Sequence, residues 1–595
     1  MRATLLLVAA LAGTVFAQSA TVDPKSVGEQ IDINEIDRTL KAIDVDRTSG
    51  GEGERQSAAY LERKLAEYGV HHTRYDMKAY LSWPKRATVT ASGPSGAPGA
   101  EFRAVTPAFS ASTGPSGMTA DLFFLPPKRN PDSDDPGRLP PAVRGKIVVA
   151  PGLIAPEVVL RAQQAGATGV IHVNDNDILH EMIATTIWGT PGASEIDRLP
   201  RIPVASITQS DGRTLRQLAA AGAKIRITTE LEQGWTTIPL VVADVPGGTD
   251  DFVLVATHLD AWYHGMTDTA GTVASILDMA RVLQRHHAEL ARGVRFAWWP
   301  GHSFGRYPGS TWYVDHFWAD LDRHCVAYTN LDGSGRRGSR MDAVTAGGWP
   351  GIAEFSREFA DKLTGKSVGS RRRDTALFRP TRDSDSAFQG IGIPEFSIGV
   401  PGPGRGHPDV EEAGEITYWH TAQDTYEKLD LKALELDTRY RVAEIYALAA
   451  TPLLPLRIAP IAQSYVKAID ELSNAAGPAF DLSTTRRAAE ALAAAASRFD
   501  AQPKPSTPPT ITERNRLLVR VTHALNSRLY TEAGRFRQDP AAVMPTLPLL
   551  ASAADLSALA KDSDAFGFLE ADLIRGRNAV EATLREMTEK LKSEK

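Results

Sequence analysis

Apolar runs that alternate with helical patterns over residues 239–455 constrain the fold of this 595-residue chain more than any other feature. Four of these runs have the length and composition of buried strands, at residues 252–256, 294–299, 326–331 and 394–398. The first run is followed by apolar residues at helical spacing over residues 273–283. Such alternation predicts an α/β fold with a mostly parallel central sheet and helices on both faces. Ligands of such sheets bind at the carboxyl ends of the strands.

Histidine and aspartate residues follow the first predicted strand at this end. His258 closes the strand in a His-x-Asp sequence with Asp260, and Asp268 lies in the loop that leads into the next helix. Imidazole and carboxylate groups are ligands that suit zinc, and His258 and Asp268 could converge above the strand end. The stretch therefore predicts one half of a metal site.

Composition and targeting signals narrow the functional class. The net charge of -6 gives no reason to expect nucleic acid or an acidic membrane surface as a partner. Residues 1–17 have the pattern of a secretory signal peptide, with Arg2 at the start and a small-residue cleavage site before Gln18. No later stretch is long and apolar enough to span a bilayer. Because Cys325 is the only cysteine, an internal disulfide and a zinc–thiolate cluster are excluded. We expect a protein that is secreted or periplasmic after signal-peptide cleavage.

Changes in composition divide the rest of the chain. Residues 140–235 read as a compact α/β unit without a convergent acid, base or nucleophile. The last part is rich in Ala, Leu, Arg and Glu and closes with an amphipathic helical pattern over residues 566–591. A first folded unit begins at residue 23 and extends to about residue 80, and the α/β pattern resumes at residue 237.

The compact α/β unit resembles the protease-associated (PA) domain that is inserted in some secreted peptidases. The segments VRGKIVVA, AQQAGATGVIHV and IPVASITQSDGRTL carry this resemblance. The segment TPAFSASTGPSGMTADLFFL is similar to the one that leads into the insertion in the glutamate carboxypeptidase II and transferrin receptor family. The resemblance implies an inserted apical domain at 81–238 between two parts of a main domain, which lie at 23–80 and, with the metal site, at 239–455. It also implies that the helical domain at 456–595 forms a homodimer interface. The alternative is a helical cap on a monomer.

The second part of the main domain resembles the di-zinc family of aminopeptidases and glutamate carboxypeptidases. The matching segments are THLDAW with His258 and Asp260, GMTD with Asp268, YTNLD with Asp332, and YWHTAQDTYEKLD with His420. The resemblance implies that His258, Asp268 and Asp332 hold one zinc ion. It also implies that Asp268 bridges to a second zinc ion beside His420. Asp260 would accept the free ring N–H of His258.

The chain departs from this family directly after the strand segment VRFAWWP. The family carries a Glu-Glu pair there, the first as general base and the second as a ligand of the second zinc, whereas this chain has His302 and Ser303. The second metal site is left with Asp268 and His420, unless His302, Ser303 or His264 contributes, because catalytic zinc usually has three protein ligands. His302 can replace the base, since an unperturbed imidazole pKa of about 6.5 suits proton transfer near neutrality.

Three functions are consistent with this pattern. The first is a secreted zinc-dependent hydrolase of the aminopeptidase or carboxypeptidase type, which cleaves a peptide or small amide with metal-activated water. The second is a receptor-like binding protein with a degenerate metal site. The third is a serine hydrolase, because residues 301–305 read Gly-x-Ser-x-Gly and are followed by Asp332 or Asp383 and by His420. We adopt the first, with His302, Asp260 and Ser303 as predicted catalytic residues and His264, Trp419 and Asp383 as predicted substrate contacts.

Overall fold

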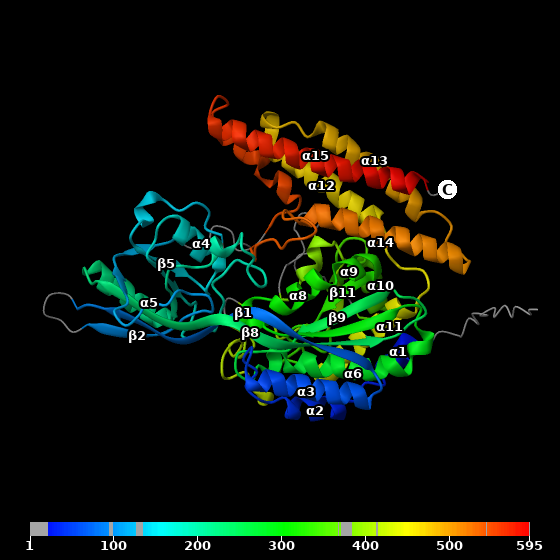
Figure 1. The fold of residues 1–595 in the computed structure, drawn as a ribbon, viewed down its shortest axis with the longest axis horizontal. Helices are drawn as coiled ribbons and strands as arrows, with labels where there is room; N and C mark the ends of the chain where they lie inside the picture. The colour runs from blue at the N-terminus through cyan, green and yellow to red at the C-terminus, as the bar shows by residue number, and fades with distance from the viewer. Residues whose placement is uncertain are drawn as a thin grey trace, which may run out of the picture.

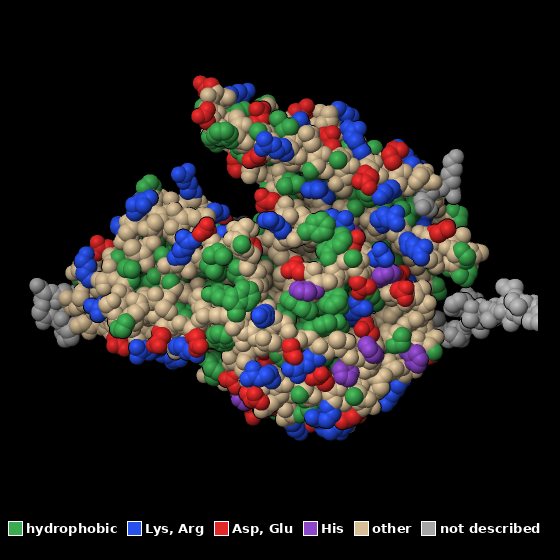
Figure 2. Space-filling model, in the orientation of Figure 1, with side chains coloured by type: hydrophobic (Ala, Val, Ile, Leu, Met, Phe, Trp, Pro, Cys, Tyr) green, Lys and Arg blue, Asp and Glu red, His purple; other side chains and the backbone are tan. Residues whose placement is uncertain are grey.

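Three bodies make up the protein in the computed structural model, which describes residues 22–93, 99–126, 135–366, 368–369, 384–411, 414–542 and 544–593. Figure 1 shows a central α/β body, an apical α/β body to its left and a helical body above it. The surface is hollowed where the apical and helical bodies face each other (Figure 2). The predicted signal peptide and Asp383 lie outside the described residues. Across the described ranges, no helix has both the length and the apolar character needed to cross a bilayer.

One mixed sheet runs through both α/β bodies, in the strand order β11-β9-β10-β8-β1-β2-β7-β6-β5-β4. Its strands β9 (Phe252–His258), β10 (Gly293–Trp299) and β11 (Cys325–Asn330) are parallel and confirm three predicted strands. The neighbouring strands β8 (Ile225–Val245) and β1 (His71–Ala91) pair antiparallel. The α/β class is therefore confirmed, and the sheet is mixed rather than mostly parallel.

Strand β14 (Phe396–Gly399) corresponds to the fourth predicted strand, but it does not join the parallel strands. It pairs antiparallel with β12 (Val344–Gly348), which in turn pairs with β13 (Val368–Gly369). A single parallel bridge between Tyr328 and Glu395 links this small sheet to β11. The prediction placed β14 in the wrong sheet because an apolar run records burial and says nothing of which strand lies beside it.

Helices cover both faces of the central sheet, as predicted (Figure 1). One face packs against α1 (Pro24–Gly28), α2 (Ile33–Ala42), α3 (Glu52–Glu67), α6 (Gly271–Arg285) and α11 (Leu431–Ala450). The other face packs against α8 (Pro308–His316) and α9 (Trp318–His324). The same body contains the short helix α7 (His302–Gly305) after β10, and helix α10 (Ala353–Thr364), which packs against β12. The site residues therefore project from the edge of a sheet that is buried on both sides.

The apical body is built on the far halves of β1 and β8. Its other elements are β2 (Ala100–Val105), β3 (Met118–Ala120), β4 (Leu122–Phe124), β5 (Ile147–Pro151), α4 (Pro156–Gln164), β6 (Gly169–Val173), β7 (Val204–Ile207) and α5 (Gln209–Ala220). The predicted domain boundaries at residues 80 and 238 fall inside β1 and β8. Continuous strands rather than linkers therefore join the apical body to the central one.

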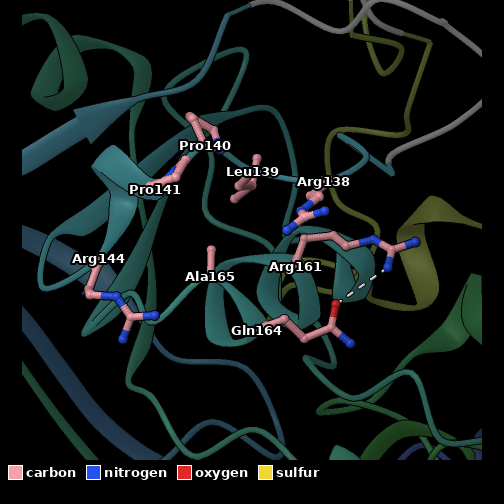
Figure 3. A pocket seen from close by; sticks show the side chains of 8 residues that line it. All are labelled: Arg138, Leu139, Pro140, Pro141, Arg144, Arg161, Gln164 and Ala165. Carbon is pink, nitrogen blue, oxygen red and sulfur yellow. Dashed lines mark hydrogen bonds between the residues drawn. The ribbon is translucent and has the colours of Figure 1, made fainter. Parts of the chain in front are cut away.

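A cavity of about 690 Å³ lies in the apical body beside α4 (Figure 3). Its lining consists of Arg138, Leu139, Pro140, Pro141, Arg144, Arg161, Gln164 and Ala165. The guanidinium of Arg161 forms an ion pair with Asp135 at 2.7 Å and hydrogen-bonds to Gln164. No residue predicted for the site lines this cavity.

The C-terminal body is helical, as predicted. It comprises α12 (Ala459–Ala476), α13 (Ser483–Asp500), α14 (Pro508–Tyr530) and α15 (Asp564–Ser593). Helix α14 lies between the bundle and the central body (Figure 1), where Ser527 Oγ donates a 2.6 Å hydrogen bond to the carbonyl of Gly390. Dimerisation through this body stays a prediction.

Candidate metal centre

The first half of the centre forms where β9 and β11 end side by side. His258 is the last residue of β9, and Asp332 follows β11. The Nε2 atom of His258 lies 3.1 Å from Asp268 Oδ1 and 3.6 Å from Asp332 Oδ1. In a tetrahedral zinc site with bonds of about 2.0–2.1 Å, two ligand atoms lie about 3.4 Å apart. One of the two distances is slightly shorter than this value and the other slightly longer. One imidazole and two carboxylates thus have the spacing and the chemistry to hold a zinc ion.

Asp268 joins this half to a second one. Its Oδ1 atom faces His258, while its Oδ2 atom lies 3.1 Å from Nε2 of His420. The Asp268 side chain is buried, and its backbone N–H and that of Thr267 donate to the Asp424 carboxylate at 3.0 and 2.9 Å. A carboxylate that offers one oxygen to each of two imidazoles can bridge two metal ions.

The two histidine rings are oriented by backbone carbonyl groups. His258 donates its Nδ1–H to the backbone oxygen of Asp260 at 2.7 Å, and His420 donates its Nδ1–H to the backbone oxygen of Glu181 at 2.8 Å. In both rings Nε2 is left to face the carboxylates. The prediction named Asp260 as the partner of His258, and the structure assigns this contact to the carbonyl rather than the carboxylate. The Glu181 contact comes from the apical body and has no signal in the sequence.

The Asp260 carboxylate instead holds the start of α7. It accepts the backbone N–H groups of His302 and Ser303 at 2.9 and 2.8 Å and the hydroxyl of Ser49 at 2.5 Å. Asp260 is fully buried. A carboxylate at the N-terminus of a helical turn satisfies N–H groups that have no partner within the turn. Asp260 therefore positions the segment that carries His302 and Ser303.

The charges in this cluster balance each other. Burial disfavours the imidazolium form of His258, but Asp332 and Asp268 outweigh it and raise the pKa of His258 well above its usual value. Burial also disfavours the ionised form of Asp268, yet His258 and His420 hold the pKa of Asp268 well below its usual value. In His420 burial prevails over Asp268 and lowers the pKa. The carboxylates therefore favour a positive charge at this point. A bound metal ion can provide that charge in place of a proton on His258.

His302 lies directly against the first half of the centre. Its ring stacks on that of His258, with centroids 3.8 Å apart and an interplanar angle of 17°. Potential ligand atoms of His258, His302 and Asp332 all lie within 4.8 Å of one another. On its other side, His302 Nδ1 lies 2.9 Å from the carboxylate of Asp385. The prediction singled out Asp383 and missed Asp385, although the apolar residues that follow Asp385 predict its burial.

Ser303 does not form the predicted serine triad. Its hydroxyl is buried and has no hydrogen-bond partner among the described residues. The Nε2 atom of His420, the predicted partner, faces Asp268 instead. The second half of the centre thus contains Asp268 and His420, with a serine hydroxyl where the family pattern has a carboxylate.

The predicted substrate contacts separate into near and distant residues. Trp419 stacks on His420 with ring centroids 3.4 Å apart, and Trp262 lies 4.0 Å from the same ring. His264 points away to the surface, where its Nδ1 lies 2.6 Å from Asp44 and its side chain is 45% exposed. Trp419 therefore borders the centre, whereas His264 does not join it.

An α/β sheet with one buried aspartate between two imidazoles at its edge is the class of scaffold on which a metal-dependent hydrolase site can form. Comparison with known families agrees, because residues 241–442 match the model for peptidase family M28 and residues 108–215 match the model for the PA domain. Residues 241–442, in the central body, are therefore similar to peptidase family M28, and residues 108–215, in the apical body, are similar to the PA domain.

Relatives named as a carboxypeptidase and as an aminopeptidase match part of the chain. The probable glutamate carboxypeptidase VP8 of Zea mays is 24% identical over 485 residues, which is 70% of this chain and 66% of that protein. The probable leucine aminopeptidase 2 of Aspergillus oryzae is 26% identical over 342 residues, which is 55% of this chain and 64% of that protein. The chain thus spans just under two thirds of the length of these two relatives.

Two solved structures show the fold. The aminopeptidase from Aneurinibacillus sp. strain AM-1 superposes with a TM-score of 0.53 at 19% identity, over 72% of this chain and 96% of that chain. The peptidase M28 precursor from Shewanella amazonensis superposes with a TM-score of 0.54 at 17% identity, over 73% of this chain and 98% of that chain.

Proposed function

We propose that the chain is a zinc-dependent hydrolase of the aminopeptidase or carboxypeptidase type. The observation that carries the proposal is Asp268, which presents one carboxylate oxygen to His258 and the other to His420. Asp332 completes the first site. A zinc ion held there would supply Lewis acidity, which polarises a carbonyl group and makes water a stronger nucleophile.

The chain's own residues would serve this chemistry in distinct ways. Asp332, 33% exposed at its side chain, lies on the open side of the centre, so substrate can approach there. Trp419 would form an apolar wall beside His420. His302 would accept the proton of the attacking water. Peptide or small amide substrates are proposed because the similar proteins are named as glutamate carboxypeptidase and leucine aminopeptidase.

Metal analysis of purified wild type and of His258→Ala, paired with a hydrolysis screen, tests the proposal. We expect bound zinc in the wild type, its loss in His258→Ala, and chelator-sensitive turnover of aminoacyl or acyl-amino-acid substrates. His264→Ala is the matched control, because this histidine lies in the same loop but points to Asp44 at the surface. Wild type without zinc, or zinc content unchanged in His258→Ala, would contradict the metal assignment.

A receptor-like binding protein is the second candidate. It is favoured by the second half of the centre, where Ser303 stands in place of a metal-binding carboxylate and its hydroxyl has no hydrogen-bond partner among the described residues. Stoichiometric zinc without turnover of any amide substrate would support this function over hydrolysis.

We further propose secretion and a homodimer. Secretion is supported by the pattern of residues 1–17, and a dimer by the exposure of Phe568 on α15, which is 74% exposed. N-terminal sequencing of the exported protein and light scattering after size exclusion test these two points. A mature protein that begins at Met1, or a monomer at micromolar concentration, would contradict them.

A further inference from the structure

Asp385 is a buried carboxylate that the family resemblance does not place in the chemistry, yet it contacts His302. We propose that Asp385 is a positioning residue that fixes His302 as the proton acceptor of the site, so that an Asp–His pair takes the place of the family's glutamate base. This inference rests on the proposed hydrolase function and adds a residue to it.

Hydrogen bonds hold the Asp385 carboxylate in place at each oxygen. Oδ2 lies 2.9 Å from His302 Nδ1, and Oδ1 accepts the hydroxyl of Ser310 at 2.8 Å. The backbone oxygen of Asp385 accepts the hydroxyl of Tyr328 at 3.2 Å. The side chain is fully buried. Since these partners come from β11 and α8, Asp385 is anchored to the rigid part of the central body.

The bond to Asp385 decides which nitrogen of His302 carries the proton. In the proposed pair Asp385 acts as a carboxylate, which only accepts, and Nδ1 of His302 is the nitrogen that donates. Nε2 is then left with a free lone pair. The ring is held against rotation, because His258 stacks on one face at 3.8 Å and Tyr307 meets it edge-on at 4.8 Å. His302 is therefore presented in one tautomer and one orientation.

The stacking geometry favours a base over a metal ligand. An imidazole binds a metal ion through the in-plane lone pair of its nitrogen. The rings of His258 and His302 are nearly parallel, at 17°, with centroids 3.8 Å apart. Because the two ring planes are nearly parallel, the in-plane lone pairs of His258 and His302 do not converge on one point. The Nε2 lone pair of His302 remains available for a proton.

The proton then follows a closed path. As the water oxygen bonds to the carbonyl carbon of the substrate, Nε2 of His302 takes one proton from that water. When the carbon–nitrogen bond breaks, the same proton passes to the leaving amine. Asp385 accepts the Nδ1–H bond throughout and stabilises the imidazolium that forms in between. The products are a carboxylic acid and an amine, and His302 returns to its starting state.

A double-mutant cycle separates this role from a purely structural one. In Asp385→Asn the amide can donate to Nδ1 and so stabilise the wrong tautomer, and we expect kcat to fall by about 10²-fold or more with KM within about threefold. Bound zinc should be unchanged. If Asp385 acts only through His302, adding Asp385→Asn to His302→Ala should lower kcat by less than about twofold.

Asp278→Asn is the matched control, because Asp278 is also a buried aspartate that accepts a backbone N–H, from Asp32 at 2.9 Å. It should keep kcat near the wild-type value. Loss of zinc from His302→Ala would overturn the inference, since His302 would then be a ligand. Additive losses in the double mutant would overturn it as well.

A readout that does not depend on turnover keeps the inference testable if the hydrolase proposal fails. In protein labelled with ¹⁵N-histidine, the His302 signals are assigned by their disappearance in His302→Gln. We expect the Nδ1–H tautomer at His302 in the wild type. The Nε2–H tautomer would refute the role of Asp385, whereas absent turnover with the Nδ1–H tautomer would refute only the hydrolase function.

Discussion

The substitution Asp260→Asn separates two roles that the Asp260 side chain can have. If the carboxylate oriented the His258 ring, its loss would weaken the metal site. In the structure the ring N–H of His258 goes to the backbone oxygen of residue 260, which the substitution retains. The carboxylate accepts hydrogen bonds from His302, Ser303 and Ser49 instead. We therefore expect Asp260→Asn to keep its zinc and to lose stability and activity.

The magnitude follows from the number of acceptors. An asparagine side chain has one acceptor oxygen, so at least one backbone N–H of α7 faces an NH₂ group and loses its partner. A hydrogen bond to a charged group contributes about 1.5–3 kcal/mol, so we expect a loss of about 2 kcal/mol in the free energy of unfolding. With roughly 2–4 °C per kcal/mol for a domain of this size, Tm should fall by about 4–8 °C. A shifted α7 should also lower kcat, because it carries His302.

Calorimetry, zinc analysis and steady-state kinetics on the same preparation measure all three effects. Asp278→Asn is again the control, with a comparable fall in Tm but normal zinc content and normal kcat. Zinc content of Asp260→Asn below half of the wild-type value, with Tm unchanged, would refute the reasoning, because the carboxylate would then act on His258.

Three further expectations concern the metal, the pH dependence and the domain contact. Chelator should lower the Tm of the wild type but not of His258→Ala, because bound metal stabilises only the folded state; scanning fluorimetry measures this. Burial opposes ionisation of Glu35, yet hydrogen bonds from Lys64 and two neighbours hold its pKa at about 2, against about 4.3 in an unfolded chain. Its ionised form thus stabilises the fold above about pH 4, so the Tm deficit of Glu35→Gln at pH 7 should vanish as the pH falls towards 2. Gly392→Ala should lower the free energy of unfolding by about 3 kcal/mol. Residue 392 has a φ of +88°, and the new Cβ would lie 2.1 Å from the carbonyl oxygen of His523 on α14. Normal thermal unfolding of this variant would contradict the contact between the central and helical bodies.

The sequence predicted those parts of the fold whose signal is local. The strands β9, β10 and β11 are buried on both faces and therefore read as short apolar runs. The strands β1 and β8 extend over 21 residues each and cross from one body to the other. In the half of each strand that lies in the apical body, buried residues alternate with more exposed ones, so no single hydrophobic pattern runs through the whole strand. The domain boundaries at residues 80 and 238, which the family resemblance implied, consequently cut both strands in the middle.

The same distinction holds for the site. His258, Asp268, Asp332 and His420 come together in the structure because loops at the strand ends carry them to one edge of the sheet. The strand and loop pattern predicted His258 and Asp268, whereas Asp332 and His420 were implied by the resemblance to the di-zinc family. Asp385 reaches His302 through a contact between residues far apart in the chain, and no periodicity encodes such a contact.

The contacts of His420 show that the apical body helps to position the candidate metal centre. The residue is tied to Glu181 twice, through the ring bond to the Glu181 carbonyl and through the 3.0 Å bond from the Glu181 N–H to the His420 carbonyl. The apical segment is in turn fixed to the helical body, where the N–H of Ala541 donates to the carbonyl of Thr186 at 2.7 Å. In the second half of the centre, Ser303 stands where the family has a carboxylate. The histidine of this half, His420, is oriented by the apical body. Because Glu181 makes both contacts through its backbone atoms, substitutions of its side chain leave them in place, whereas a displacement of the apical segment would turn the His420 ring away from Asp268.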